Sequence, residues 1–565
     1  MTALFDFFYW LDSSVPLYWT FAWVAFGLWS LSAVVPYDPA HPWRRFHPPA
    51  VHAFLMLLML VAFRWPGIAE NMELANPDES EWIAGALTLA DRGSYWGNLD
   101  SHTSGPLNLV PLLLPKLWGG PIDFTAARIV GLLLYWGTCL FAWSIVRRAA
   151  GDWFARVLLL PLASCIAFTV YVEFVQYGSE QSATFLIALA AWLAYTAFAA
   201  DGRLISRGRL ALAGFVCVCI PLTKLQAAPL AAALGLWSLG GALAQPGTDW
   251  QSRRAAAGWL VAGVLAGLGL LILSVAATGA YRDFYSGFWV ANLNHAKDRA
   301  YPWLAFPSHL WEMVKAARGF TYYFVSSVGL AAAGLVLIPW LARGDRRPAV
   351  FGAVLLAAGF LTVISPGHPF PHYLQFLLFP LSLCCALLYA GLARSGNSRL
   401  PRFGWPLLCL AVGLGPLIYY RTVDWSPFLG HFRQTRGNMV GPVAAEILRH
   451  ARPGDRLTVW GWMPRFYVQT QLPQGTRNAH TRLQINPHPL REHSRQQFLS
   501  DLETNRPELF VDAIGERNFG YQSRHEHGYE NTPWLHLFIH NNYVQVADIE
   551  TTRIFVRRDR MPASP

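Results

Sequence analysis

The chain has 565 residues, of which 54% are hydrophobic and 14% are charged, and it contains 25 Trp and 35 Phe. This apolar content exceeds that of a soluble enzyme and predicts a polytopic membrane protein. The net charge of +10 comes largely from arginines in short loops between apolar segments, so it does not indicate a nucleic-acid-binding protein.

Apolar segments long enough, or nearly long enough, to cross a bilayer recur from residue 17 to residue 420 and predict about twelve transmembrane helices. The first segment has no basic region before it and no small-residue cleavage site after it, so we expect a retained helix. Two short segments, 210–222 and 226–242, flank Lys224. The longer segments lie near 17–35, 50–64, 126–146, 155–175, 183–200, 256–278, 320–341, 349–365, 373–392 and 404–420.

The arginines fall in alternate loops, and this bias predicts that the basic loops face the cytoplasm. These loops lie near 36–49, 147–156, 201–209, 243–255, 342–348 and 393–403. The loops expected on the other side of the membrane are 65–125, 176–182, 223–225, 279–319, 366–372 and everything after about residue 421.

The long external loop 65–125 contains the acidic run Asn76-Pro77-Asp78-Glu79-Ser80-Glu81. Carboxylates beside a bilayer are costly unless they are solvated or matched by a cation, so their position indicates an active site. The alternative is a solvated acidic loop without a chemical role. Glu79 and residues 82–86 have the spacing of an amphipathic helix, which we expect to lie along the membrane surface with Asp78 at its N-terminal end.

The apolar run 107–117 in the same loop is broken by Pro111 and Pro115. It is too short to span a bilayer comfortably, so we expect a re-entrant or interfacial segment.

The C-terminal residues 423–565 are polar and predict a separate small α/β domain after a membrane domain of residues 1–422. The pattern predicts a helix at 443–448, strands at 457–460 and 509–512, and a hairpin of 544–546 with 554–556. His525-Glu526-His527 lacks a third ligand at a recognisable spacing, so it does not predict a metal site. All seven cysteines lie in predicted spans, where we expect them to serve in packing.

The order of features in loop 65–125 resembles the first external loop of the polyprenyl-phosphate-dependent GT-C glycosyltransferases, in particular the protein mannosyltransferase and lipid A aminoarabinose transferase group. That order is an apolar span, Asp78-Glu79, a short helix, Gly93, and a Gly105-Pro106-Leu107 turn. The resemblance extends over most of the chain. It includes two further segments, the His-Tyr segment 365–374 and the start of the soluble domain at 459–464 and 476–478.

The resemblance implies that Asp78 is the catalytic carboxylate and that Glu79 is the second acid of the paired motif. Family members often carry a Lys-Pro-Pro-Leu turn whose lysine approaches the donor phosphate. This chain has Ser104-Gly105-Pro106-Leu107 instead. Either the cation that binds the phosphate comes from elsewhere in the chain, or the donor binds in a different position.

Lys224 is the first candidate for this cation, because it lies between two short spans without an acidic neighbour in sequence. An unpaired lysine at that depth indicates an anion supplied by the substrate, and the alternative is a lysine that snorkels to the interface. Tyr373 stands at the start of the predicted span 373–392, where an interfacial aromatic belt would also account for it. The remaining candidates for phosphate or substrate binding are His102, Arg299, His368, His372, Tyr373 and Glu180.

The function implied is an inverting transfer of a hexosyl or pentosyl group from a polyprenyl-phosphate donor, with Asp78 accepting the proton of the acceptor hydroxyl. The expected acceptor is a periplasmic lipopolysaccharide, another envelope glycan or a protein, and the expected location is the bacterial inner membrane. Mg²⁺ or Mn²⁺ is a candidate cofactor at Asp78 and Glu79, with phosphate oxygens completing the shell. A lipid-linked sugar transporter or flippase, and a polymerase or ligase with a diphosphate-linked donor, are the alternatives.

Overall fold

The computed structural model describes residues 6–7, 10–11, 14–35, 48–69, 76–92, 94–101, 103–169, 171–199, 201–297, 303–317, 319–336, 338–340, 343–395 and 440–561. The chain divides into two compact units, which we call the helical unit and the sheet unit. The helical unit comprises residues 1–70, 131–271 and 296–434, and the sheet unit comprises residues 71–130, 272–295 and 435–565. The predicted boundary near residue 422 lies outside the described residues.

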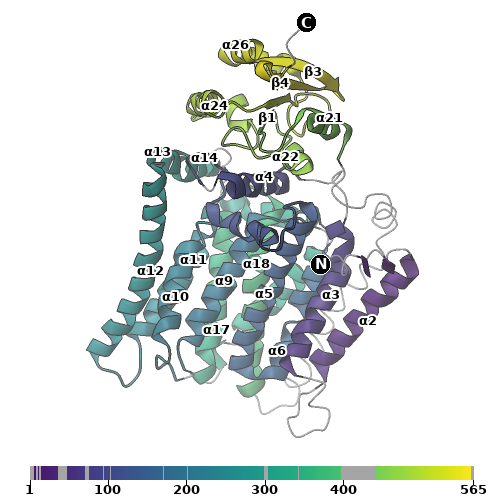
Figure 1. The fold of residues 1–565 in the computed structure, drawn as a ribbon. Coiled ribbons are helices and arrows are strands. Elements are labelled where there is room, and N and C mark those ends of the chain that lie inside the picture. The colour runs from purple at the N-terminus through teal and green to yellow at the C-terminus, as the bar shows by residue number, and fades with distance from the viewer. Residues whose placement is uncertain are drawn as a thin grey trace. The chain divides into compact units, whose positions relative to one another are not determined.

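The helical unit is a bundle of helices, many of them long and apolar (Figure 1). Within the described residues, seven helices are long and apolar enough to cross a membrane, which agrees with an integral membrane protein. They are α2 (Val15–Val34), α3 (Pro49–Ala69), α5 (Phe124–Ala150), α11 (Ala228–Leu243), α12 (Trp250–Thr278), α17 (Arg343–Ile364) and α18 (Gln375–Ser395).

Shorter helices complete the bundle. The segment near 155–175, predicted as one span, forms α6, α7 and α8, because Pro161 stands at the start of α7 and cannot continue the hydrogen bonding of α6. The shorter helices are α6 (Asp152–Leu158), α7 (Leu160–Phe168), α8 (Val172–Val175), α9 (Ser179–Thr196), α10 (Arg207–Cys219), α15 (Phe306–Ala316) and α16 (Phe320–Val336). The predicted span near 404–420 lies outside the described residues.

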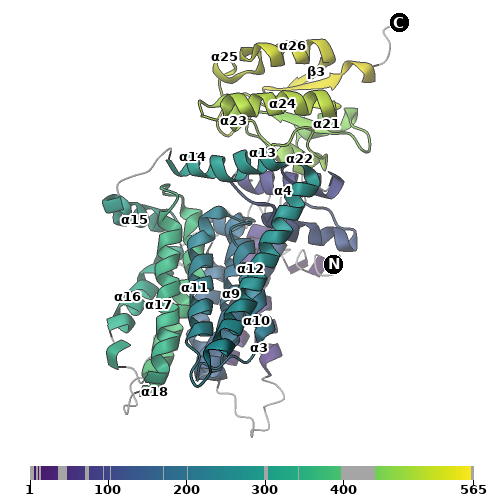
Figure 2. The same cartoon turned by 90° about the vertical axis from the view of Figure 1, so that its left-hand side faces the viewer.

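Helix α18 is the central element of the helical unit. Its apolar stretch is buried along its whole length, and it packs against α9, α16 and α17, which Figure 2 shows from the side. The Pro371–Leu374 turn, η9, leads directly into α18. This turn therefore holds its side chains at a fixed place at one end of the bundle.

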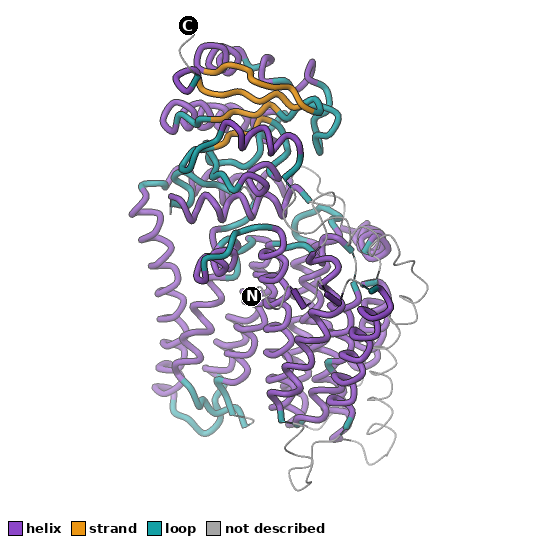
Figure 3. The backbone as a smooth tube through the Cα atoms, turned by 45° about the vertical axis from the view of Figure 1, so that its right-hand side comes forward, coloured by secondary structure: helices purple, strands orange, loops and turns teal. Residues whose placement is uncertain are grey.

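The sheet unit contains a four-stranded sheet with the order β1-β2-β4-β3 (Figure 3). Strand β1 pairs with β2 in parallel, β4 pairs with β2 antiparallel, and β3 and β4 form a hairpin. These strands and the helix α21 confirm the elements predicted for this region. The strands are β1 (Leu457–Trp460), β2 (Leu509–Asp512), β3 (Tyr543–Ile549) and β4 (Thr552–Arg557).

Helices cover both faces of this sheet, and each face has its own apolar core. The other elements are the 3₁₀-helix η4 (Val110–Trp118), the π-helix η6 (Phe284–Val290), and α4 (Pro77–Arg92), α13 (Tyr281–Asp283), α14 (Ala291–Lys297), α21 (Pro442–His450), α22 (Arg465–Thr470), α23 (Arg482–Ile485), α24 (Arg491–Asn505), α25 (Arg524–His527) and α26 (Pro533–Asn542).

The acidic helix predicted in loop 65–125 is α4, and its environment differs from the prediction. Ala84 belongs to the same core as Leu457 and Leu509 of the sheet. Thr88 Oγ1 accepts a hydrogen bond from the backbone N–H of Gln474 at 3.0 Å. The side chains of residues 82–87 are buried inside the protein, so the apolar face of α4 packs within the sheet unit.

Candidate functional site

The N-terminal end of α4 is fixed by the two residues that start it. Pro77 occupies the first helical position, where its missing N–H is not needed. The side chain of Asn76 accepts a hydrogen bond from the backbone N–H of Asp78 at 2.9 Å. This is the usual role of a helix N-cap, and it places Asp78 in the first turn, where the helix dipole stabilises a carboxylate.

Glu79 is buried in an ion pair with Arg128 of α5. Arg128 Nε donates to Oε1 and Oε2 of Glu79 at 3.0 and 3.2 Å, and Nη2 donates to Oε2 at 2.7 Å. Both side chains are at most 2% exposed. Because both carboxylate oxygens are held by one guanidinium, Glu79 does not fit the predicted role of a metal ligand. It fixes α4 against the start of α5.

Glu81 is the third acid of the helix and faces a histidine from the C-terminal part of the chain. His480 Nε2 lies 3.2 Å from Glu81 Oε2, and both side chains are buried. The ring of His480 packs against that of Trp462, with centroids 5.2 Å apart. This contact fixes α4 to the segment that follows β1.

The three acids near the N-terminal end of α4 therefore differ in kind. Glu79 and Glu81 are buried against a cation or a histidine, whereas the side chain of Asp78 is half-buried and reaches solvent. A carboxylate that is preorganised at a helix N-terminus yet accessible can accept a proton from a bound hydroxyl. Of these three acids, Asp78 is the one that stays a candidate for the catalytic role predicted from the sequence.

The turn at residues 104–107 is also anchored within the sheet unit. The hydroxyl of Tyr95 donates to the backbone carbonyl of Ser104 at 2.9 Å. Burial, with a smaller contribution from the charge of Asp100, raises the pKa of Tyr95 well above its ordinary value. Tyr95 therefore stays neutral and keeps this hydrogen bond at any physiological pH.

A second cluster of predicted residues lies in the helical unit, around the Pro371–Leu374 turn. Lys224 forms an ion pair with Glu180, and its ammonium nitrogen lies 5.1 Å from the ring centroid of Tyr373. His372 Nδ1 lies 3.2 Å from Glu173 Oε2, and its Nε2 lies 3.7 Å from Glu180 Oε1. Glu180, Lys224, His372 and Tyr373 were all predicted site residues, and the fold brings them together.

This cluster corrects the prediction that Lys224 is unpaired. Its partner Glu180 stands at the start of α9, 44 residues away in sequence, so local inspection of the sequence could not reveal it. The carboxylates of Glu173 and Glu180 offset the positive charges of Lys224 and His372. The cluster therefore offers hydrogen-bond donors and acceptors together, and it is not a site of simple positive charge.

The other predicted residues lie elsewhere. His368 is buried in the loop before η9, where its ring stacks on that of Phe370 with centroids 5.3 Å apart. His102 and Arg299 lie outside the described residues. Within the part of the chain that the structure describes, no group of three or more His, Cys, Asp or Glu side chains is placed to hold a metal ion.

Sequence reasoning missed Arg128 and His480. Arg128 did carry a signal, because it is the one basic residue in the predicted span 126–146, and ionisable residues within spans usually have a role. His480 carried none, since 399 residues separate it from Glu81.

We predict that Lys224→Met lowers the thermal stability of the purified chain, because it leaves Glu180 buried with His372 alone. Breaking one partner of a buried ion pair costs about 3–5 kcal/mol, whereas removing both charges costs much less. The double variant Lys224→Met/Glu180→Gln is therefore expected to recover most of the loss in melting temperature. A single variant with an unchanged melting temperature would contradict this prediction.

No family model and no curated relative matches this chain. Solved structures that share its fold include two of the same protein. The crystal structure of ArnT from Cupriavidus metallidurans bound to undecaprenyl phosphate has a TM-score of 0.57 and 12% identity, and the match covers 92% of this chain and 100% of that chain. The same protein in the apo state gives 0.55 and 13%, with the same coverage. The chain has the fold of ArnT, and the GT-C fold expected from the sequence is confirmed.

Proposed function

We propose that this chain, with its ArnT fold, is an inverting glycosyltransferase that takes a hexosyl or pentosyl group from a polyprenyl-phosphate donor. The observation that carries the proposal is the state of α4, where Asp78 is accessible while Glu79 and Glu81 are held by Arg128 and His480. The fold supports it, and the ArnT that shares this fold was crystallised with undecaprenyl phosphate.

The reaction is a single displacement at the anomeric carbon. The acceptor oxygen attacks this carbon while its proton passes to the carboxylate of Asp78, and the bond between the anomeric carbon and the phosphate oxygen breaks. The bonding electrons leave with the phosphate, so the products are the glycosylated acceptor and the polyprenyl phosphate. Attack from the face opposite the leaving group inverts the anomeric configuration. General base catalysis of this kind contributes about 10²- to 10⁴-fold.

The cluster of Glu180, Lys224, His372 and Tyr373 is the proposed substrate-binding group of the helical unit. Its paired charges suit a ligand with both hydroxyl groups and a negative charge, such as a sugar phosphate, because carboxylates accept from hydroxyls while Lys224 and His372 donate. We place the reaction on the periplasmic side of the bacterial inner membrane. The acceptor is a lipopolysaccharide, another envelope glycan or a protein.

The test uses the purified full-length chain in lipid nanodiscs with two radiolabelled donors and an extract of envelope glycans as acceptor. One donor is a polyprenyl-monophosphate sugar, and the other is a diphosphate-linked oligosaccharide. We expect label in the acceptor from the monophosphate donor alone. Transfer from the diphosphate donor alone would indicate a polymerase or ligase. Movement of the labelled lipid across a vesicle bilayer without a new glycosidic bond would indicate a transporter.

A further inference from the structure

The sheet unit contains a cleft that the proposed chemistry does not use. It has a volume of about 740 Å³ and is lined by the C-terminal end of α4, η4, the turn after α21, and the end of α22. This volume lies in the usual range of ligand pockets, about 300–1,000 Å³. Leu87 and Leu472 form part of its wall, and charged side chains lie around it. The cleft is therefore large enough for several sugar units.

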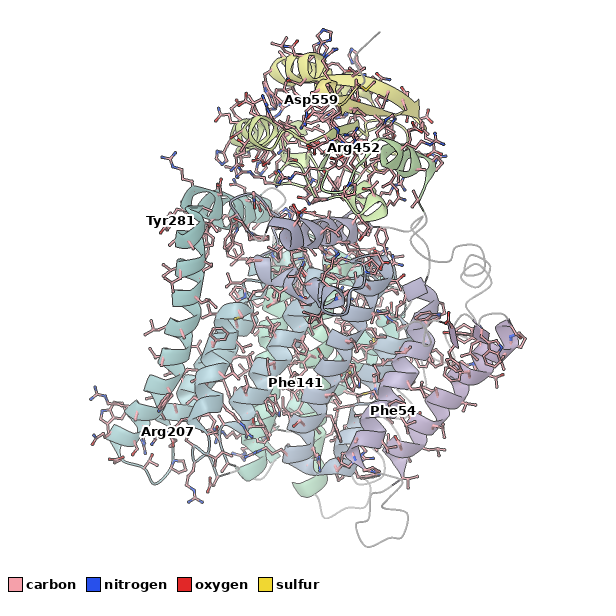
Figure 4. The ribbon with its side chains drawn as sticks, in the orientation of Figure 1. Phe54, Phe141, Arg207, Tyr281, Arg452 and Asp559 are labelled. Carbon is pink, nitrogen blue, oxygen red and sulfur yellow. The ribbon has the colours of Figure 1, made fainter. Side chains whose placement is uncertain are left out.

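The charges of the cleft favour an anion. Lys116 of η4 and Arg452, which is labelled in Figure 4, are both exposed. Neither side chain forms an ion pair with any other described residue. The acid Asp455 is already neutralised, because Arg560 donates to its two oxygens at 3.0 and 2.8 Å. Asp91 is the remaining acid of the lining. With Asp455 neutralised by Arg560, the two cations Lys116 and Arg452 outnumber this one acid.

The walls of the cleft are rigid. The carboxylate of Asp455 also accepts a hydrogen bond from the backbone N–H of Arg452 at 2.7 Å, which closes the turn after α21. Gly454 in this turn has a φ of +87°, a conformation that residues with a Cβ rarely adopt. On the opposite wall, the side chain of Gln471 donates to the backbone carbonyl of Ile122 at 3.1 Å. These contacts hold the turn after α21 and the end of α22 in place.

The cleft does not offer the backbone pairing by which many domains bind extended peptides. The neighbouring strand β1 is already paired on this side, because Leu457 N–H donates to Pro473 and Gly475 N–H donates to Leu457. Addition of a peptide strand needs a free sheet edge. Exposed cations, an amide side chain and short apolar walls instead suit an anionic sugar chain, with its charges, hydroxyls and apolar ring faces.

The cleft lies far from the catalytic carboxylate along the same helix. Asp91 lies thirteen positions after Asp78 in α4, which corresponds to about 20 Å at the rise of an α-helix. We propose that the cleft is a remote subsite that binds an anionic oligosaccharide, the distal part of an extended acceptor whose near end reaches Asp78. This assignment of the ligand as acceptor rests on the proposed transferase function.

Binding is tested on the full-length chain in detergent without any donor, so the outcome does not depend on sugar transfer. The probe is a fluorescently labelled oligogalacturonate, an anionic sugar chain, and its anisotropy gives the Kd. We expect the double variant Lys116→Glu/Arg452→Glu to raise this Kd by about tenfold or more. A neutral maltooligosaccharide of the same length is expected to bind much more weakly to the wild type.

The matched control is Arg449→Glu, which reverses a charge on α21 three residues before Arg452. Arg449 is 75% exposed but pairs with Glu446 and does not line the cleft. We expect it to leave the Kd of oligogalacturonate unchanged. Equal effects of the control and the double variant, an unchanged Kd in the double variant, or tighter binding of a polyglutamate peptide of the same charge would overturn the proposal. A wild type that binds the probe but transfers no sugar would overturn the proposed function alone.

Discussion

Asp78→Asn is expected to reduce sugar transfer by about 10²- to 10⁴-fold while the chain still folds. The amide retains the shape of the side chain but cannot accept the proton of the acceptor hydroxyl. Because Asp78 is half-buried and stands outside the ion pairs of Glu79 and Glu81 with Arg128 and His480, its replacement leaves those contacts in place. The measurement is the initial rate of label transfer at saturating donor, with the melting temperature recorded for the same preparation.

The matched control is Glu312→Gln, an acid on α15 that is 64% exposed and pairs with Lys315 one turn away. This variant is expected to transfer sugar at the wild-type rate. If Asp78→Asn also keeps the wild-type rate, then Asp78 is not the general base and the mechanism proposed for α4 is wrong.

Arg128→Met is expected to destabilise the sheet unit by about 3–5 kcal/mol and to lower the transfer rate as well. The variant leaves the carboxylate of Glu79 buried without its guanidinium partner. We expect α4 to move so that this carboxylate reaches water. The stability and the transfer rate of Arg128→Lys are expected to lie between those of Arg128→Met and the wild type. A lysine keeps the charge but cannot make the forked contact with both oxygens of Glu79. Thermal unfolding in detergent and the transfer rate are measured together.

The double variant Arg128→Met/Glu79→Gln separates the two effects. It removes both charges, so most of the stability is expected to return. The transfer rate is expected to stay low in the double variant if the ion pair is also needed to hold Asp78 in position. A single variant that unfolds at the wild-type temperature would show that the pair contributes little.

The elements of the fold could be predicted from local patterns. Apolar segments predicted the long helices, and short strand-like runs predicted β1 and β2 at the residues where they occur. The predicted hairpin of 544–546 with 554–556 lies within the longer strands β3 and β4. The break within 155–175 was not predicted, because the segment is largely apolar and long enough for one span although it contains Pro161. The position of Asp78 on a helix N-terminus was predictable, because Asn76 and Pro77 are local signals.

The partners of the site residues could not be predicted, since they depend on contacts between distant parts of the chain. The apolar residues of α4 have the pattern of a helix that lies on a membrane, and the same pattern serves a helix packed against a sheet. The sequence could not distinguish the two, and Ala84 lies in the core with Leu457. Lys224 looked unpaired for the same reason, because Glu180 is remote in sequence.

The contact between Glu81 and His480 has a consequence for the order of events during synthesis. The two residues are 399 positions apart, so at about 5–20 residues per second the ribosome adds His480 about 20–80 s after Glu81. During that interval the acidic helix has no histidine to hold it and no sheet to pack against. Glu81 therefore gains its histidine partner, and α4 its packing against the sheet, only after the C-terminal residues have been synthesised.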